Sequence, residues 1–353
     1  MSTLATNAIT DASGGSTATI NGYTPTLSNM AGRNRIINGD MRIDQRNAGA
    51  AVTVNANAYF YTLDRFAGIG ENTDGVFTIQ QDSSAPSGFS KSLKVTVTTA
   101  DTSLGATQFY NLNQLIEGYN VSDFGFGTAS AKSITLSFWV KSSVTGVFGG
   151  SFRNNALTAN YAFTYTINSA NTWEYKTVTI TGETSAVWES TNGIGLRVSW
   201  SLGSGSDKLY AAGSWLSTGA SSASGAIGET NLMATSGATF YITGVQLEAG
   251  SVATPFEHRQ YGQELALCER YLERCQYSIL GYGATGAYIS APVNYRQVKR
   301  VTPTLTETNE FSSNVATVGF PYVNSTYGMS AYLVTASTGS ADYRGLFFAS
   351  AEL

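Results

Sequence analysis

One stretch of the chain, residues 241–276, combines a strand pattern with the only convincing helical pattern of the sequence. Its first part alternates apolar and polar residues, and the alternation changes phase at Gly244, which predicts a β-bulge. Its second part repeats apolar residues at steps of four and three, as one face of a helix does. This stripe consists of Tyr261, Leu265, Cys268, Leu272 and Cys275. We therefore predict one α-helix, residues 259–277, that links β-structure on both sides.

The apolar stripe of the predicted helix indicates a contact between chains. Its five residues fit the a and d positions of about two and a half heptads, fewer than a free coiled coil needs. We expect an oligomerisation helix in a homotrimer whose flanking β-domains add interface. The alternative is that the stripe packs onto the sheet of its own chain.

The two cysteines, Cys268 and Cys275, lie one heptad apart in the predicted helix. Their α-carbons would be separated by roughly 10 Å of helix rise, which is too far for a disulfide within one helix. We prefer two buried thiols, in a chain assembled in a reducing cytoplasm, over a disulfide between chains.

Strand patterns fill the residues before the helix. Apolar and polar residues alternate between turn signals, and about eight short strands are expected. The clearest segments are 92–98, 133–141, 174–180 and 195–202. The predicted fold class is all-β, with an antiparallel jelly-roll sandwich over residues 34–258. Residues 278–353 predict a small C-terminal β-domain, which is marginal alone and would lean on the helix and on neighbouring chains.

The first 33 residues are polar and low in complexity, and such a segment cannot order itself alone. We interpret residues 1–33 as an attachment arm; the alternative is a loose terminus. The chain is only 12% charged, with a formal net charge of −4. No basic patch, signal peptide or apolar run of ~18 residues is visible, so neither a nucleic-acid partner nor membrane insertion is expected.

The sequence offers little for catalysis or metal binding. His258 is the single histidine, so a Ser-His-Asp arrangement or a histidine-rich metal site is not expected. It is predicted to bond to Glu257, Arg259 or backbone. Asp64 and Arg65 could form half of a metal site, but we favour local hydrogen bonds at a strand entry. No catalytic residue, metal or cofactor is predicted. A glycosidase needs two carboxylates in one cleft, which a sequence cannot pair.

Several aromatic residues lie on or near predicted strands, and Trp139 points to the polar face of its strand if Phe138 is core. Exposed rings on a sandwich face can stack against sugars. The glycan-binding candidates are Trp139, Tyr110, Trp173 and Tyr175, with Tyr161 and Tyr165 nearby. The alternative is that these rings are packed under loops or between subunits.

Four segments share a resemblance. They are GRNRIINGDMRIDQRNAG (32–49), YTLDRF (61–66), VQLEAGSVATPFEHRQYGQELALCERYLERC (245–275) and the ending LFFASAEL (346–353). Together they resemble structural proteins of tailed-bacteriophage virions, which are fibres or fibre-like components with a carbohydrate-binding-module-like sandwich. The chain departs from that group in having no long shaft.

The resemblance implies a non-enzymatic virion protein, assembled in the host cytoplasm. It would be a trimeric tail fibre or fibre-like appendage that contributes to attachment to host-surface glycan, with the N-terminal arm docked to other virion proteins. The alternatives are a capsid decoration or head-fibre protein, a soluble carbohydrate-binding module and a polysaccharide-degrading tail protein.

Overall fold

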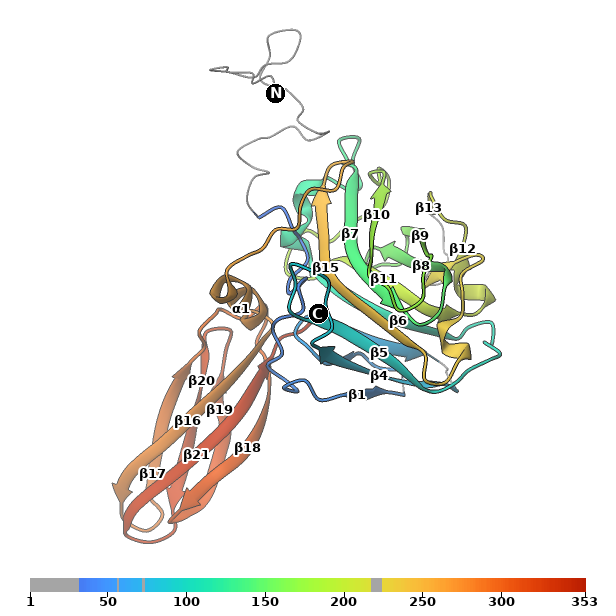
Figure 1. Ribbon diagram of the computed structural model, residues 1–353. Helices are drawn as coiled ribbons and strands as arrows, with labels where there is room; N and C mark the ends of the chain where they lie inside the picture. The colour runs from blue at the N-terminus through green and yellow to red at the C-terminus, as the bar shows by residue number, and fades with distance from the viewer. Residues whose placement is uncertain (1–31, 56, 72–73, 217–223) are drawn as a thin grey trace, which may run out of the picture.

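The structure is a computed structural model, and the residues that it describes are 32–55, 57–71, 74–216 and 224–353. Within them the chain forms a two-sheet β-sandwich, one short α-helix and an elongated C-terminal β-domain. That domain extends from the helix away from the sandwich (Figure 1). The predicted attachment arm, residues 1–33, lies outside the described residues except for Gly32 and Arg33.

Two antiparallel sheets form the sandwich in the described part of the chain. The six-stranded sheet has the order β1 (Val52–Val54), β4 (Val76–Asp82), β5 (Ser92–Thr99), β15 (Thr239–Ala249), β7 (Ile134–Ser142), β10 (Glu174–Ile180). The seven-stranded sheet has the order β13 (Trp215–Leu216), β9 (Asn160–Ile167), β8 (Gly146–Arg153), β11 (Ile194–Ser204), β6 (Phe109–Glu117), β3 (Phe66–Glu71), β2 (Phe60–Tyr61). A short parallel pair accompanies them, β12 (Leu209–Tyr210) with β14 (Gly225–Ala226). The predicted antiparallel sandwich is confirmed, with more strands than the patterns indicated.

Alternation explains why these segments become strands. The four clearest predicted segments coincide with β5, β7, β10 and β11, and their inward residues fill the core. Phe138 of β7 meets Trp200 of β11 across the sandwich, with ring centroids 5.9 Å apart. Fully burying a side chain such as Phe138 is worth about 1.5–3 kcal/mol, so the two sheets hold together through many such contacts.

The helix is shorter than predicted. α1 spans Tyr261–Glu269, and the chain continues as strand β16 (Leu272–Gly283). The predicted helix over residues 259–277 is therefore wrong at its C-terminal end. Leu272 and Cys275 lie on a strand, so the five-residue helical seam does not exist.

A second pattern explains this correction. Cys275, Tyr277 and Ile279 are buried and alternate with exposed residues, as in a strand. β16 is 12 residues long and pairs with β21 (Gly339–Ser350) along its whole length. A helix shorter than ~12–15 residues is marginal alone, so this ladder outweighs further helix. Buried Lys299 fixes the change, because its Nζ donates to the Glu269 carbonyl and to the Glu273 carboxylate, both at 2.5 Å.

The C-terminal β-domain begins at Leu272 rather than at residue 278. Its described strands form two three-stranded sheets. One sheet has the order β16, β21, β18 (Thr304–Ser313), and the other has the order β17 (Tyr288–Asn294), β20 (Gly328–Thr335), β19 (Val315–Asn324). The core between them includes the fully buried Leu333 and Phe347.

Of the stripe residues that remain on α1, Leu265 and Cys268 pack within their own chain, whereas Tyr261 is 55% exposed. Cys268 is fully buried and clusters with Ile37, Ile43 and Tyr271. Cys268 and Cys275 are both buried free thiols, as predicted. Burial raises the pKa of the Cys275 thiol to about 12, so this sulfur stays protonated near neutral pH.

A buried polar network ties the sandwich to the C-terminal domain. We call it the joint network: Glu117, Arg270, Tyr271, Arg65 and Glu352. The Glu117 carboxylate, 1% exposed, accepts from Arg270 at 2.5 and 2.9 Å and from the Tyr271 hydroxyl at 2.6 Å. Arg65 lies 3.7 Å from the Tyr271 ring centroid and pairs with Glu352. The chain terminus thereby returns to the sandwich (Figure 1).

We predict that Glu117→Ala lowers the free energy of unfolding by about 3 kcal/mol, because it leaves Arg270 and the Tyr271 hydroxyl without their buried acceptor. Denaturant unfolding followed by far-UV circular dichroism measures this change. The control is Asp342→Ala, which removes an exposed pair with Arg344 and should cost less than about 1 kcal/mol. Equal effects of the two variants would contradict the role given to Glu117.

Candidate functional site

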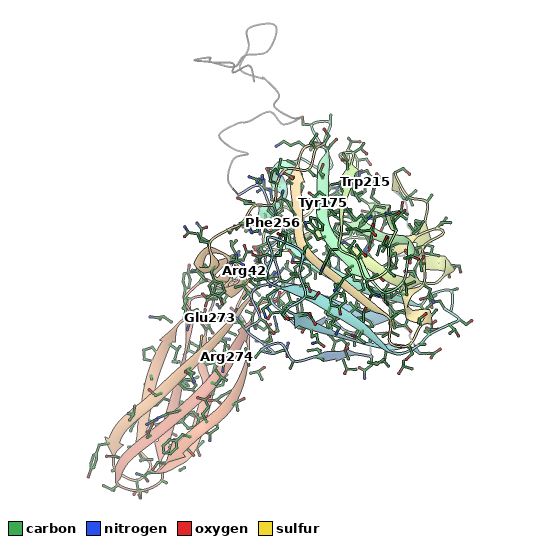
Figure 2. All side chains as sticks on the ribbon, viewed as in Figure 1. Arg42, Tyr175, Trp215, Phe256, Glu273 and Arg274 are labelled. Atoms are coloured by element: carbon green, nitrogen blue, oxygen red, sulfur yellow. The ribbon has the colours of Figure 1, made fainter. Side chains whose placement is uncertain are left out.

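A line of aromatic side chains crosses the outer face of the six-stranded sheet. We call it the aromatic ridge: Tyr175, Trp139, Phe89, Phe256 and His258. Trp139 and Tyr175 are directly paired on β7 and β10, with ring centroids 5.4 Å apart. Phe89 lies 5.1 Å from Phe256 and 5.3 Å from His258. In Figure 2 the labels Tyr175, Phe256 and Arg42 follow one another toward α1.

Gly244 joins the two halves of the ridge. β15 changes register between Thr243 and Gln246, and Gly244 has φ +61°, so the predicted β-bulge is confirmed. A Cβ at this position would lie 2.7 Å from the Phe89 ring and 3.1 Å from the Trp139 ring. The missing side chain therefore lets both rings lie over the backbone of β15, and a larger residue would push them away.

Two lysines surround a second pair of rings on the same face. The Lys141 ammonium lies 4.0 Å from the ring centroid of Tyr241 and 5.2 Å from that of Trp173. Lys94 approaches Tyr241 from the neighbouring strand, at 5.7 Å. Lys141 also donates to the Ser84 hydroxyl at 2.6 Å, which fixes its position. The ammonium groups of Lys141 and Lys94 therefore supply hydrogen-bond donors beside the aromatic ridge.

A groove of about 410 Å³ lies at the α1 end of the ridge, lined by Asp40, Arg42, Phe89 and His258 among others. The exposed His258 ring lies against Phe89 and Phe256. The predicted bond of His258 to Glu257, Arg259 or backbone is not among the contacts of the described residues. The rings, the groove and its polar walls form a surface suited to a sugar chain, since sugars stack their C–H faces on rings.

The structure brings three of the four glycan-binding candidates together. Trp139, Trp173 and Tyr175 lie on the outer face, and Tyr175 is 44% exposed. Tyr110 is a wrong candidate: it is 0% exposed, and its hydroxyl donates to Asp101 at 2.7 Å. It faces inward because the alternation along β6 turns Tyr110, Leu112 and Ile116 to the core.

Tyr161 and Tyr165 also belong to the core, at 5% and 6% exposure. Sequence reasoning missed Phe89, Phe256 and Tyr241. The alternation of Phe240 and Ile242 already placed Tyr241 outward, whereas the two phenylalanines lie outside strands, where no alternation applies.

Another aromatic cluster lies elsewhere on the sandwich, around Trp215 (Figure 2). Trp215 packs against Trp188 and Phe126, with ring centroids 5.6 and 5.7 Å apart. Both indole N–H groups are occupied, by the Thr181 carbonyl and the Glu183 carboxylate. The adjoining cavity measures only about 60 Å³, far below the roughly 300 Å³ of a small ligand site. This cluster is structural.

Glu229 is a half-buried carboxylate against the outer face of the seven-stranded sheet. It accepts from the Ser201 hydroxyl at 2.5 Å and from the Ala226 amide at 2.9 Å. Gly149 and Gly225 lie so close that a Cβ on either would overlap the carboxylate. Burial raises the pKa of Glu229 to about 7, although the hydrogen bond from Ser201 opposes this shift.

Asp64 and Arg65 have structural partners. Asp64 accepts from the amide and side chain of Gln45 at 3.1 and 2.6 Å, and Arg65 donates to the Leu115 carbonyl at 2.5 Å. Both residues are hydrogen-bonded, but the prediction of local hydrogen bonds is wrong, because these partners are distant in sequence. In the part of the chain that the structure describes, no group of three or more His, Cys, Asp or Glu could hold a metal ion. No described helix has the length and apolar character to span a membrane.

Comparisons with known proteins give structural similarities only. No protein-family model matches the chain, and no curated protein sequence matches it. The enzymatically active domain of bacteriophage CBA120 tailspike protein 4 is 12% identical over 61% of this chain, with a TM-score of 0.30. The matched part is 21% of that tailspike chain, about a fifth of its length.

Carbohydrate-binding modules match a similar share of the chain. A CBM4 structure is 18% identical over 60% of this chain and 97% of its own, with a TM-score of 0.28. A family 22 carbohydrate binding module from Clostridium thermocellum is 13% identical over 56% of this chain and 99% of its own, with a TM-score of 0.30. Identities and TM-scores this low carry no argument about function, so the site must rest on its own geometry.

We predict that the stability of the chain falls as pH rises through the titration of Glu229. A carboxyl whose folded pKa is raised binds its proton more tightly when folded, so its stabilising effect is lost between the ordinary value of 4.5 and about 7. Glu229→Gln cannot titrate, so it should not show this loss. The free energy of unfolding of the variant, relative to that of wild type, should rise by about 2–3 kcal/mol from pH 4.5 to pH 8. Urea unfolding at both values tests it; parallel pH profiles would contradict the shift.

Proposed function

We propose that the chain is a non-enzymatic structural protein of a tailed-bacteriophage virion. It is a trimeric tail fibre or fibre-like appendage that assembles in the host cytoplasm and contacts host-surface glycan through the aromatic ridge. The N-terminal arm, residues 1–33, docks it to other virion proteins. A head-fibre or capsid decoration protein is the nearest alternative, since the same surface would serve there.

The observation that carries the glycan contact is the aromatic ridge itself. Trp139 and Tyr175 pair on the outer face of a sandwich sheet, and the missing side chain of Gly244 leaves room for the Phe89 ring on the same face. A sugar stacked on exposed rings buries little surface, so each site should bind weakly. Several copies on one particle would supply avidity. The virion setting is supported by the resemblance of four segments to phage structural proteins.

We predict that Trp139→Ala weakens binding to oligosaccharides from the host surface about tenfold, which corresponds to about 1.4 kcal/mol of lost stacking. A glycan array with the intact protein, followed by titration calorimetry on the best oligosaccharide, measures the change. The control is Tyr327→Ala, which removes a ring that is 69% exposed in the C-terminal domain. No binding by wild type, or equal loss in both variants, would make the ridge structural.

We predict a particle mass near three times that of one chain, 37.4 kDa, in light scattering.

The chains of this trimer cannot meet along the predicted helical stripe, because Leu272 is 1% exposed within its own chain. Leu272→Glu should therefore unfold the C-terminal domain. Leu267→Glu changes a residue on α1 that is 37% exposed, and it should dissociate a trimer whose chains meet along the helix while leaving the fold intact. A monomeric wild type contradicts the trimer.

A further inference from the structure

A cleft lies where the C-terminal domain meets the sandwich. We call it the joint cleft. It measures about 710 Å³, and its walls come from residues 44–48, α1, β16, β21 and Arg296. Sites that bind small molecules occupy roughly 300–1,000 Å³ and often lie between domains. The joint cleft therefore has the size and the place of a ligand site, and it is separate from the aromatic ridge.

Part of the cleft wall is apolar. Leu346 and Phe348 point outward from β21 because Phe347, between them, lies in the core. Leu265 of α1 continues this surface, and the ring of Tyr261, 55% exposed, stands beside it. Half-buried apolar side chains beside an exposed ring can accept the C–H face of a sugar.

Three guanidinium groups surround this apolar wall. Arg46 donates to Glu352 at 2.6 Å, and Arg296, whose side chain is 61% exposed, donates to Glu269 at 2.8 Å. Arg274 is exposed, and its side chain has no hydrogen bond or ion pair with any residue that the structure describes. Figure 2 labels it near the α1 end of the domain.

Carboxylates pair with two of these three guanidinium groups and leave Arg274 without an ion pair among the described residues. Asp44 is held by the amides of Asn47 and Gly49, at 2.9 and 2.6 Å, and shapes its own turn. Glu269 is occupied by Arg296. The cleft therefore keeps one uncommitted guanidinium, Arg274, beside the unused donors of Arg296. A planar guanidinium matches a carboxylate through two parallel hydrogen bonds.

We propose that the joint cleft binds an acidic sugar, with the sugar ring against Phe348 and Leu265 and its carboxylate on Arg274. The site differs in ligand class from the aromatic ridge and does not require the ridge to bind. A uronic acid has an apolar ring face, which can pack on the apolar wall of the cleft, and a carboxylate beside it, which can bind the Arg274 guanidinium.

The test is titration calorimetry of the full chain with tri-galacturonic acid, and with galactotriose as the neutral match. We expect binding of the acidic trimer only, weakening as salt rises. Arg274→Gln should weaken it at least tenfold. The control is Arg344→Gln, which changes an exposed arginine on the outer face of the same sheet, outside the cleft, and should leave binding unchanged.

Additional titrations distinguish this proposal from binding at the aromatic ridge, from phosphate binding and from a contact between chains. Trp139→Ala should leave the affinity for tri-galacturonic acid unchanged, so the cleft and the ridge can fail independently. Equal binding of galactotriose, or an equal effect of Arg344→Gln, overturns the proposal. Tighter binding of glucose 6-phosphate than of the acidic trimer overturns the assignment of a carboxylate. A change of particle mass in Arg274→Gln shows a contact between chains and overturns the ligand site.

Discussion

The position of the C-terminal domain depends on one buried carboxylate, Glu117. Its two oxygens accept three hydrogen bonds from Arg270 and Tyr271, the two residues that separate α1 from β16. A buried charge is tolerated only where it is paired and hydrogen-bonded. If the end of the helix moved, Arg270 and Tyr271 would move with it and leave the Glu117 carboxylate buried without partners. The direction in which β16 leaves the sandwich follows from this constraint.

The backbone near this network is strained. Of the seven non-glycine residues with positive φ in the described chain, four lie between positions 38 and 65, among them Asn38 and Arg65. Asn38 is held because its side chain donates to the carbonyls of Ile43 and Asp64, at 2.9 and 3.0 Å. Such conformations persist only where the surroundings over-determine them. Residues 38–48 are therefore held in one conformation, and they line both the groove at the α1 end of the aromatic ridge and the joint cleft.

Local patterns predicted the strands but not the end of the helix. The alternation of β5, β7, β10 and β11 is a property of neighbouring residues, so it is legible in the sequence. The end of α1 is decided by Lys299 and by a ladder with β21, both far along the chain. The stripe from Tyr261 to Cys275 mixes a helical face with the first inward positions of a strand, and spacing alone cannot separate the two.

The same distinction applies to the candidate surfaces. Trp139 and Tyr175 were predictable because each stands out of phase with the core of its strand, while Tyr110 failed because being on a strand does not say which face a ring takes. Phe89 lies over Gly244 and meets Phe256 from a segment far along the chain, with ring centroids 5.1 Å apart. Arg274 reaches the joint cleft only because β16 starts early. Because these surfaces are built on rigid strands, a ligand would lose less conformational entropy in ordering them, and weak contacts of a few rings or one guanidinium can then suffice.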